Sequence, residues 1–170
     1  AANKDKAWEQ LGTSGSGNHF VEFGIFKIGK NDIGLAPGEY VALLSHSGSR
    51  GVGAMVCNHY SENAKQACKS LGQDAGHLSW LSLSSQEGIE YWNAMQLMHK
   101  YAQANHDLIH KHIAKNLGAH VLFTFINSHN LAWEEDHFHK KLVVHRKGAT
   151  PAAKGQLGII PGSMSSPTYL

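Results

Sequence analysis

The chain has 170 residues, of which 42% are hydrophobic and 16% are charged, a composition that excludes a disordered chain and allows one domain with a hydrophobic core. The formal net charge of only +2 excludes a globally basic surface, so any contact with nucleic acid must be local. No apolar run approaches the roughly 20 residues of a membrane span, and no signal sequence opens the chain. We therefore expect a cytoplasmic protein without a membrane partner.

The predicted elements mix strands and helices. A strand is predicted over residues 20–28, after a glycine loop, and a short buried strand over residues 39–45. A helix is expected over residues 54–70, and apolar side chains at three- and four-residue steps predict a long helix over residues 86–116 that Gly118 ends.

Three more strands are expected in the last third of the chain, at residues 120–127, 141–145 and 157–161, of which the first is apolar enough to be central. The order of strands and helices lacks a βαβ rhythm. We therefore predict an α+β fold with mixed or antiparallel sheets and flanking helices.

Two loops combine glycine with residues that carry chemistry. Residues 12–17 form a glycine loop, which exposes backbone N–H groups to a phosphate and delivers Asn18 and His19 to the start of a strand. His46 ends the second predicted strand, and Arg50 then stands at the mouth of a helix, where anions are favoured. The alternatives are a glycine turn with a hydrogen-bonded histidine and a capping turn with Arg50 in a surface ion pair.

Three later segments add to this pattern. The predicted strand over residues 120–127 ends in a polar turn with His129, and two imidazoles brought to one sheet edge would suit Zn²⁺ or Mn²⁺. His145, Arg146 and Lys147 end another strand, where they fit either a phosphate contact or a solvated basic turn. Residues 159–164 run into a Pro-Gly turn.

Other histidines fit this pattern less well. His106 and His110 have the spacing of a zinc-protease helix, but Asp107 stands where that motif has its catalytic glutamate, so we do not expect a zinc-protease site. A position on the water-facing side of the helix is an equal alternative for both histidines. His137 and His139 follow an acidic stretch, and we interpret them as part of a solvated surface.

Taken in order, five segments resemble the RtcB family of RNA-splicing ligases across nearly the whole chain. The matching stretches are Gly15–Glu22, His46–Gly51, Ser128–Asn130, His145–Pro151 and Pro161–Met164. The resemblance implies an RtcB-like fold and a GTP- and Mn²⁺-dependent ligase that joins RNA 2′,3′-cyclic phosphate or 3′-phosphate ends to 5′-hydroxyl ends. Such an enzyme acts in tRNA splicing or RNA repair, with tRNA halves or broken RNA as its partners.

The resemblance also implies roles for individual residues. His19 would ligate one manganese, and His46 with His129 the other, while Arg50 would hold a substrate phosphate. Arg146 and Lys147 are further candidates for RNA phosphate contacts. The guanylate would contact Asn18, His19, Phe20, Val21, Glu22, His129, Asn130, Pro161, Gly162, Ser163 and Met164.

Parts of the family pattern have no match in this sequence. These are a bridging cysteine with a nearby aspartate, the His-Gly-Ala-Gly-Arg motif of the guanylylated histidine, and a C-terminal lysine. Cys57 and Cys68 fall in the wrong place, and His145 is not that nucleophile. We therefore expect residues 1–170 to be a partial, incomplete catalytic domain, inactive alone, that lacks the N- and C-terminal parts of the family.

Two other functions stay open at this point. One is a non-catalytic remnant that binds metal or nucleotide, and the other is a metal-dependent hydrolase that shares the histidines. The remnant hypothesis predicts that the natural coding sequence has its stop codon after Leu170. The hydrolase predicts a bound metal with an open water position and no affinity for guanylate.

Overall fold

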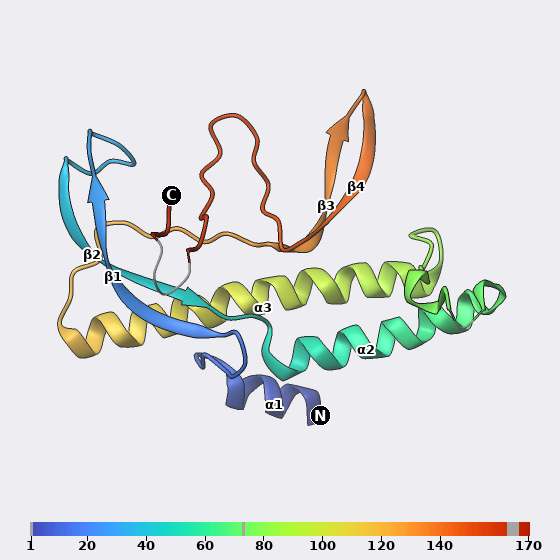
Figure 1. The fold of residues 1–170 in the computed structure, drawn as a ribbon. Coiled ribbons are helices and arrows are strands. Elements are labelled where there is room, and N and C mark those ends of the chain that lie inside the picture. The colour runs from blue at the N-terminus through green and yellow to red at the C-terminus, as the bar shows by residue number, and fades with distance from the viewer. Residues whose placement is uncertain (1, 73, 163–166) are drawn as a thin grey trace. The chain divides into compact units, whose positions relative to one another are not determined.

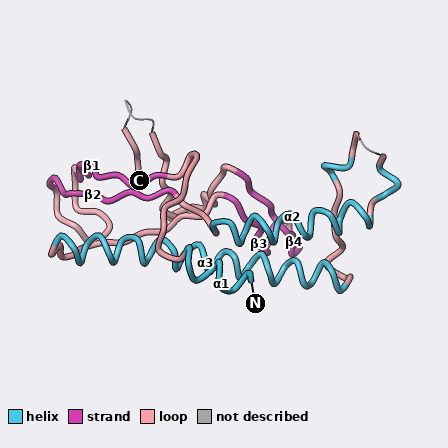
Figure 2. The backbone as a smooth tube through the Cα atoms, turned by 90° about the horizontal axis from the view of Figure 1, so that it is seen from below, coloured by secondary structure: helices cyan, strands magenta, loops and turns pink. Residues whose placement is uncertain are grey.

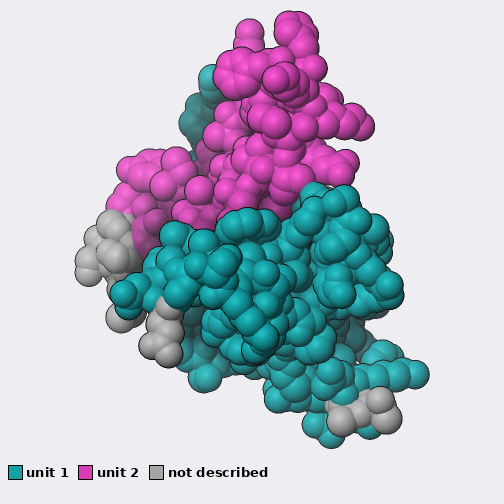
Figure 3. All heavy atoms as spheres, turned by 90° about the vertical axis from the view of Figure 1, so that its right-hand side faces the viewer, with its two compact units in different colours: residues 1–123 teal, residues 124–170 magenta. Residues whose placement is uncertain are grey.

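The computed structural model describes residues 2–72, 74–162 and 167–170. The chain divides into two compact units, Ala1–Phe123 and Thr124–Leu170 (Figure 3). Each unit is described by itself below.

The first unit is built on three helices, α1 (Ala2–Gln10), α2 (Arg50–Ala67) and α3 (Gln86–Leu117). Helix α2 packs on α3 and α1 packs on α2 (Figures 1 and 2). Two short 3₁₀ helices, η1 (Lys69–Leu71) and η2 (Gly76–Leu78), lie between α2 and α3. The ends of α3 are capped, because Ser85 Oγ accepts from the Gly88 N–H at 3.1 Å and Gly118 adopts a left-handed φ of 63°.

The same unit carries an antiparallel hairpin of β1 (Phe20–Ile28) and β2 (Gly38–His46) (Figure 1). Its register pairs Phe20 with His46, so the first residue of β1 lies opposite the last residue of β2. The glycine loop before β1 and the loop after β2 therefore meet at one end of the hairpin. This register decides where the candidate site forms.

The second unit contains a second antiparallel hairpin, made of β3 (Asn130–His137) and β4 (Lys140–Lys147). Its two-residue turn is formed by Phe138 and His139, whose φ angles of 52° and 61° are left-handed. Beyond this hairpin, Ile160 and Tyr169 form an isolated antiparallel bridge.

Most of the predicted elements are confirmed, as is the α+β class. The strands over residues 20–28, 39–45 and 141–145 and the helices over residues 54–70 and 86–116 correspond to β1, β2, β4, α2 and α3. Helix α1 and strand β3 were not predicted. No helix of the described residues is both long and apolar enough to cross a membrane.

Two predicted strands are wrong. Residues 120–127 have apolar character but form no strand, and Val121 and Leu122 remain 55% and 60% exposed. An apolar run becomes a strand only where a neighbouring strand accepts its backbone hydrogen bonds, and none of the described strands pairs with it. Over residues 157–161 the pairing is reduced to the single bridge at Ile160.

Candidate functional site

Two predicted site histidines lie side by side in the first unit. His19 directly precedes β1 and His46 ends β2, and their ring centroids are 5.9 Å apart at an interplanar angle of 71°. The Phe20 ring also contacts the His46 ring edge-on, with centroids 5.6 Å apart. The hairpin register thus brings together the two loops that were expected to carry the site.

Arg50 joins this pair from the start of α2. Its Nη1 donates to His19 Nδ1 at 3.2 Å and its Nε donates to Thr13 Oγ1 at 3.2 Å, so it bridges the glycine loop and the first histidine. The backbone of Arg50 is left-handed, with φ of 57°. Non-glycine residues in this conformation store strain and are found preferentially at functional sites.

Gly15 explains why the loop before His19 needs glycine. Its φ is +106°, and a Cβ placed on it would lie 2.0 Å from Arg50 Nη1 and 2.6 Å from His19 Nδ1. The backbone at Gly15 therefore lies so close to the Arg50 guanidinium and the His19 imidazole that no space remains for a side chain. Any larger residue at this position must displace one of these two groups.

The environment of His19 favours its neutral form. Burial is the largest cause that lowers the pKa of His19, and the charges of Arg50 and His46 lower it further, while a hydrogen bond to the Ser14 backbone opposes them. Since Arg50 donates to Nδ1, the neutral ring carries its proton on Nε2. His19 is therefore a neutral acceptor beside a permanent cation.

Helix α3 supplies a buried anchor for the same loops. Asn105 has 0% exposure, and its Oδ1 accepts from the N–H groups of Gly12 at 2.7 Å and Thr13 at 3.1 Å. Its Nδ2 donates to the Thr13 carbonyl at 3.0 Å and to Ser47 Oγ at 3.1 Å. Ser47 Oγ in turn donates to the Ser14 carbonyl at 2.8 Å. One amide thus ties the glycine loop to the loop after β2.

The histidine pair of α3 faces these loops as well, so the alternative of a water-facing pair does not hold. His106 Nδ1 lies 2.7 Å and His110 Nε2 lies 2.8 Å from Ser45 Oγ, and His106 Nε2 lies 2.9 Å from the Ser47 carbonyl oxygen. The four-residue spacing therefore converges on a hydroxyl. Asn105, Ser45 and Ser47 were missed from the sequence, although an asparagine on the packed side of a helix is a usable signal.

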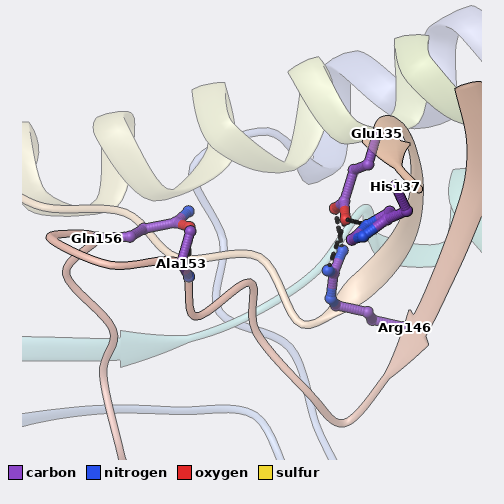
Figure 4. A network of polar contacts seen from close by, with 5 residues as sticks. All are labelled: Glu135, His137, Arg146, Ala153 and Gln156. Carbon is purple, nitrogen blue, oxygen red and sulfur yellow. Dashed lines mark hydrogen bonds and ion pairs between the residues drawn. The ribbon is translucent and has the colours of Figure 1, made fainter. Parts of the chain in front are cut away.

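In the second unit, Arg146 is held by neighbours on its own hairpin (Figure 4). Its Nη1 and Nη2 donate to the two carboxylate oxygens of Glu135, the second at 3.0 Å, and its guanidinium lies 5.2 Å from the Trp133 ring centroid. His137 Nε2 contacts Glu135 Oε2 at 2.8 Å. Lys147 is exposed. An RNA phosphate would have to compete with Glu135 for Arg146.

The other predicted guanylate contacts are distributed over both units. Asn18 is exposed just before β1 and Glu22 is exposed within β1, and Val21 pairs with Ser45 across the hairpin. In the second unit His129 directly precedes β3, and Asn130 Oδ1 accepts from the Gly148 N–H at 2.8 Å. Pro161 and Gly162 are exposed, whereas Ser163 and Met164 lie outside the described residues.

His19 and His46 are the candidate metal ligands of the first unit. Two adjacent imidazoles, His19 and His46, are ligands that suit Zn²⁺ or Mn²⁺. Over the described ranges, however, no three His, Cys, Asp or Glu side chains group closely enough to hold a metal ion. The pair therefore fits a metal only as part of a larger donor set. The sharing of one ion by His46 and His129, which belong to different units, stays a prediction.

Comparison with known proteins decides the family. The family model described as tRNA-splicing ligase RtcB matches residues 1–170. This chain belongs to the RtcB family. The family resemblance predicted from the sequence motifs is thereby confirmed, and the glycine loop, the His46 loop and Arg50 lie within the matched residues.

Individual relatives agree with this assignment. The chain is 33% identical to the tRNA-splicing ligase RtcB of Methanococcus maripaludis over 98% of its own length and 42% of the relative's. It is 34% identical to the protein of that name from Nanoarchaeum equitans, covering 98% of this chain and 41% of the relative. The RNA-splicing ligase RtcB homolog 1 of Entamoeba histolytica is 30% identical over 95% of this chain and 36% of its own length. The chain thus spans about two fifths of these relatives.

Proposed function

We propose that this RtcB-family chain contributes the phosphate- and metal-binding loops of a GTP- and Mn²⁺-dependent RNA ligase that joins 2′,3′-cyclic phosphate or 3′-phosphate ends to 5′-hydroxyl ends. The observation that carries the proposal is the convergence of His19, His46 and Arg50 at one end of the β1–β2 hairpin. The names of the relatives, tRNA-splicing ligase RtcB, support RNA as the substrate.

The role proposed for Arg50 is to hold the terminal phosphate of the RNA. A guanidinium has five N–H donors in a planar fork, and the contacts to His19 and Thr13 use two of them. These contacts fix the direction of the fork before the substrate arrives. Pre-orientation lowers the entropy lost on binding, so a strained and pre-positioned Arg50 is suited to recognising a phosphate.

The role proposed for His19 is to ligate one manganese ion, and the role proposed for His46 and His129 is to ligate the other. When bound, manganese would supply positive charge to the phosphate oxygens. A ligand of Mn²⁺ must be a neutral imidazole with a free ring nitrogen, and the lowered pKa of His19 favours the neutral ring. Its bare Nδ1 accepts from Arg50 in the metal-free chain, so ligation through Nδ1 requires Arg50 to release that contact. GTP would be the source of the guanylate, for which the candidate contacts in the first unit are Asn18, His19, Phe20, Val21 and Glu22.

The test compares two RNA oligonucleotides that differ only at the 3′ end, one with a 3′-phosphate and one with a 3′-hydroxyl. We expect tighter binding of the 3′-phosphate RNA by the wild-type chain. Removing the fork in Arg50→Ala should weaken that binding by about 10- to 100-fold, since hydrogen bonds to charged groups contribute about 1.5–3 kcal/mol each. Arg50→Lys keeps the charge but loses the fork, and should recover only part of the affinity.

Equal binding of the two RNAs, or an unchanged preference in Arg50→Ala, would contradict the proposal. Incubation with labelled GTP and Mn²⁺ is a second arm. Because the 170-residue sequence contains no His-Gly-Ala-Gly-Arg motif, no label should survive denaturation. Measured affinity for guanylate also separates a ligase or nucleotide-binding remnant from a metal-dependent hydrolase, which predicts none.

A further inference from the structure

One imidazole on α3 contacts the chain on both sides of His46. The Nδ1 of His106 lies 2.7 Å from the Ser45 hydroxyl, and its Nε2 lies 2.9 Å from the Ser47 carbonyl oxygen. Ser45 and Ser47 are the residues immediately before and after His46. The two ring nitrogens of His106 therefore span the backbone segment from which the His46 side chain projects.

His110 completes the arrangement from the next turn of α3. Its Nε2 lies 2.8 Å from the same Ser45 hydroxyl, so two imidazoles meet at one oxygen. Residues four apart lie on the same face of a helix, which places both rings above the end of β2. Burial is the largest cause that lowers the pKa of His110, and the charge of His106 lowers it further, while the charge of Asp107 opposes both.

For two neutral histidines, only one arrangement of protons satisfies all three contacts. The Ser47 carbonyl can only accept, so His106 must donate to it from Nε2 and leave Nδ1 bare. The Ser45 hydroxyl then donates its single proton to His106 Nδ1. The remaining contact requires His110 to donate from Nε2 to the Ser45 oxygen. The chain of donors thus runs in one direction, from His110 through Ser45 and His106 to Ser47.

We propose that His106 and His110 are positioning residues that hold His46, and the loop leading to Arg50, in place through Ser45 and Ser47. The inference rests on the proposed function for the role of His46, but its geometry stands on its own. The Asn105 amide donates to the Ser47 hydroxyl, whereas His106 contacts the Ser47 carbonyl, so both polar groups of Ser47 are held by α3. Asn105, His106 and His110 of one helix therefore hold the segment 45–47 through four polar contacts.

The proposal is tested first by NMR on the metal-free, nucleotide-free chain, with labelled histidine at mildly alkaline pH. We expect the proton of both His106 and His110 on Nε2. In Ser45→Ala the ring of His110 should lose this preference while His106 keeps it through the Ser47 carbonyl, and the ring resonances of His46 should shift although no atom of His46 has changed. A neutral His106 protonated on Nδ1, or His46 resonances unaffected by Ser45→Ala, would overturn the proposal.

The second readout is affinity for Mn²⁺ alone, measured by titration calorimetry. Loss of partners that orient a metal ligand typically costs 10- to 100-fold in affinity, so Ser45→Ala and His110→Leu should each weaken binding by about tenfold. His110→Gln retains an N–H donor near the position of Nε2 and should restore affinity to within about twofold of wild type. His112→Gln, at an exposed histidine of the same helix, is the matched control and should change nothing.

The two readouts separate this inference from the proposed function. If the wild-type chain binds no Mn²⁺, the metal role of His46 fails, while the proton positions and the His46 shift still decide whether His106 and His110 hold it. If His110→Leu and His110→Gln bind Mn²⁺ equally well, the donor from His110 has no positioning role and the proposal is overturned. Thermal unfolding of each variant, followed by circular dichroism, checks that the helices remain folded.

Discussion

The side-chain amide of Asn105 donates to Ser47 Oγ across 3.1 Å, and this buried contact links the middle of α3 to the loop that follows His46. The other end of the same amide accepts from two N–H groups of the glycine loop. The two loops of the candidate site are thus held to each other by a side chain that contacts no substrate in our proposal. Stability and site geometry depend here on the same residue.

Asn105→Ala should therefore strongly destabilise the first unit. The substitution leaves part-buried backbone groups of Gly12 and Thr13 and the buried Ser47 hydroxyl without their partner, and we expect a loss of about 2–4 kcal/mol in the free energy of unfolding. Urea unfolding followed by circular dichroism measures it. Asn93→Ala, at an exposed position of the same helix, is the control and should change stability by less than about 0.5 kcal/mol. Similar losses in the two variants would contradict the anchoring role.

The left-handed backbone of Arg50 predicts that its glycine and alanine variants differ in stability but not in binding. At φ of 57°, glycine avoids the steric cost that alanine retains, so Arg50→Gly should be more stable than Arg50→Ala by about 1 kcal/mol. Both variants lack the guanidinium, and both should lose affinity for 3′-phosphate RNA to the same extent. Parallel urea unfolding and RNA titrations measure the two quantities. An alanine variant as stable as the glycine variant would show that the strain is absent.

Gly15 and Gly17 form a matched pair that separates strain from crowding. Both have positive φ, +106° and +78°, so alanine should cost about 1–2 kcal/mol of stability at either position. A Cβ at Gly17 meets nothing within 4 Å, whereas one at Gly15 collides with the end of the Arg50 side chain and with His19. Gly15→Ala should therefore weaken 3′-phosphate RNA binding and Gly17→Ala should not. Equal effects on binding would mean that the close approach is unimportant.

The Arg146 guanidinium holds the pKa of Glu135 down to about 2 from its usual 4.5, with His137 as the second hydrogen-bond partner. A carboxyl group whose pKa is lowered by folding contributes its full stabilisation at pH values above its ordinary pKa. That contribution is lost as pH falls from about 4.5 towards 2. In Arg146→Ala the Glu135 pKa should rise most of the way back to its ordinary value.

Carboxyl-carbon NMR titration of Glu135 measures this change. Lys147→Ala, at the next residue of β4, is the control and should leave the Glu135 titration where it was. Added salt should weaken the Glu135–Arg146 pair in the wild type, since the pair lies near the surface. A Glu135 titration that Arg146→Ala leaves unchanged would show that another group depresses the pKa.

The sequence by itself determined the elements whose signals are local. Alternation and glycine predicted β1, apolar spacing at three and four residues predicted α3, and Gly118 marked the end of that helix in the left-handed conformation that glycine adopts readily. The motifs around His19, His46 and Arg50 likewise identified the residues that meet at one end of the hairpin. These signals work because each depends on residues within a few positions of one another.

Only the tertiary structure decided which distant groups meet. The apolar run at residues 120–127 predicts a strand, but a strand requires a partner for its backbone hydrogen bonds and the described strands provide none. The roles of Asn105, His106 and His110 were equally hidden, because their partners lie 58 to 93 residues away in the sequence. A histidine pair on a helix has the same spacing whether it faces water, a metal or a serine hydroxyl, and only the packing of α3 against the end of β2 selects the serine.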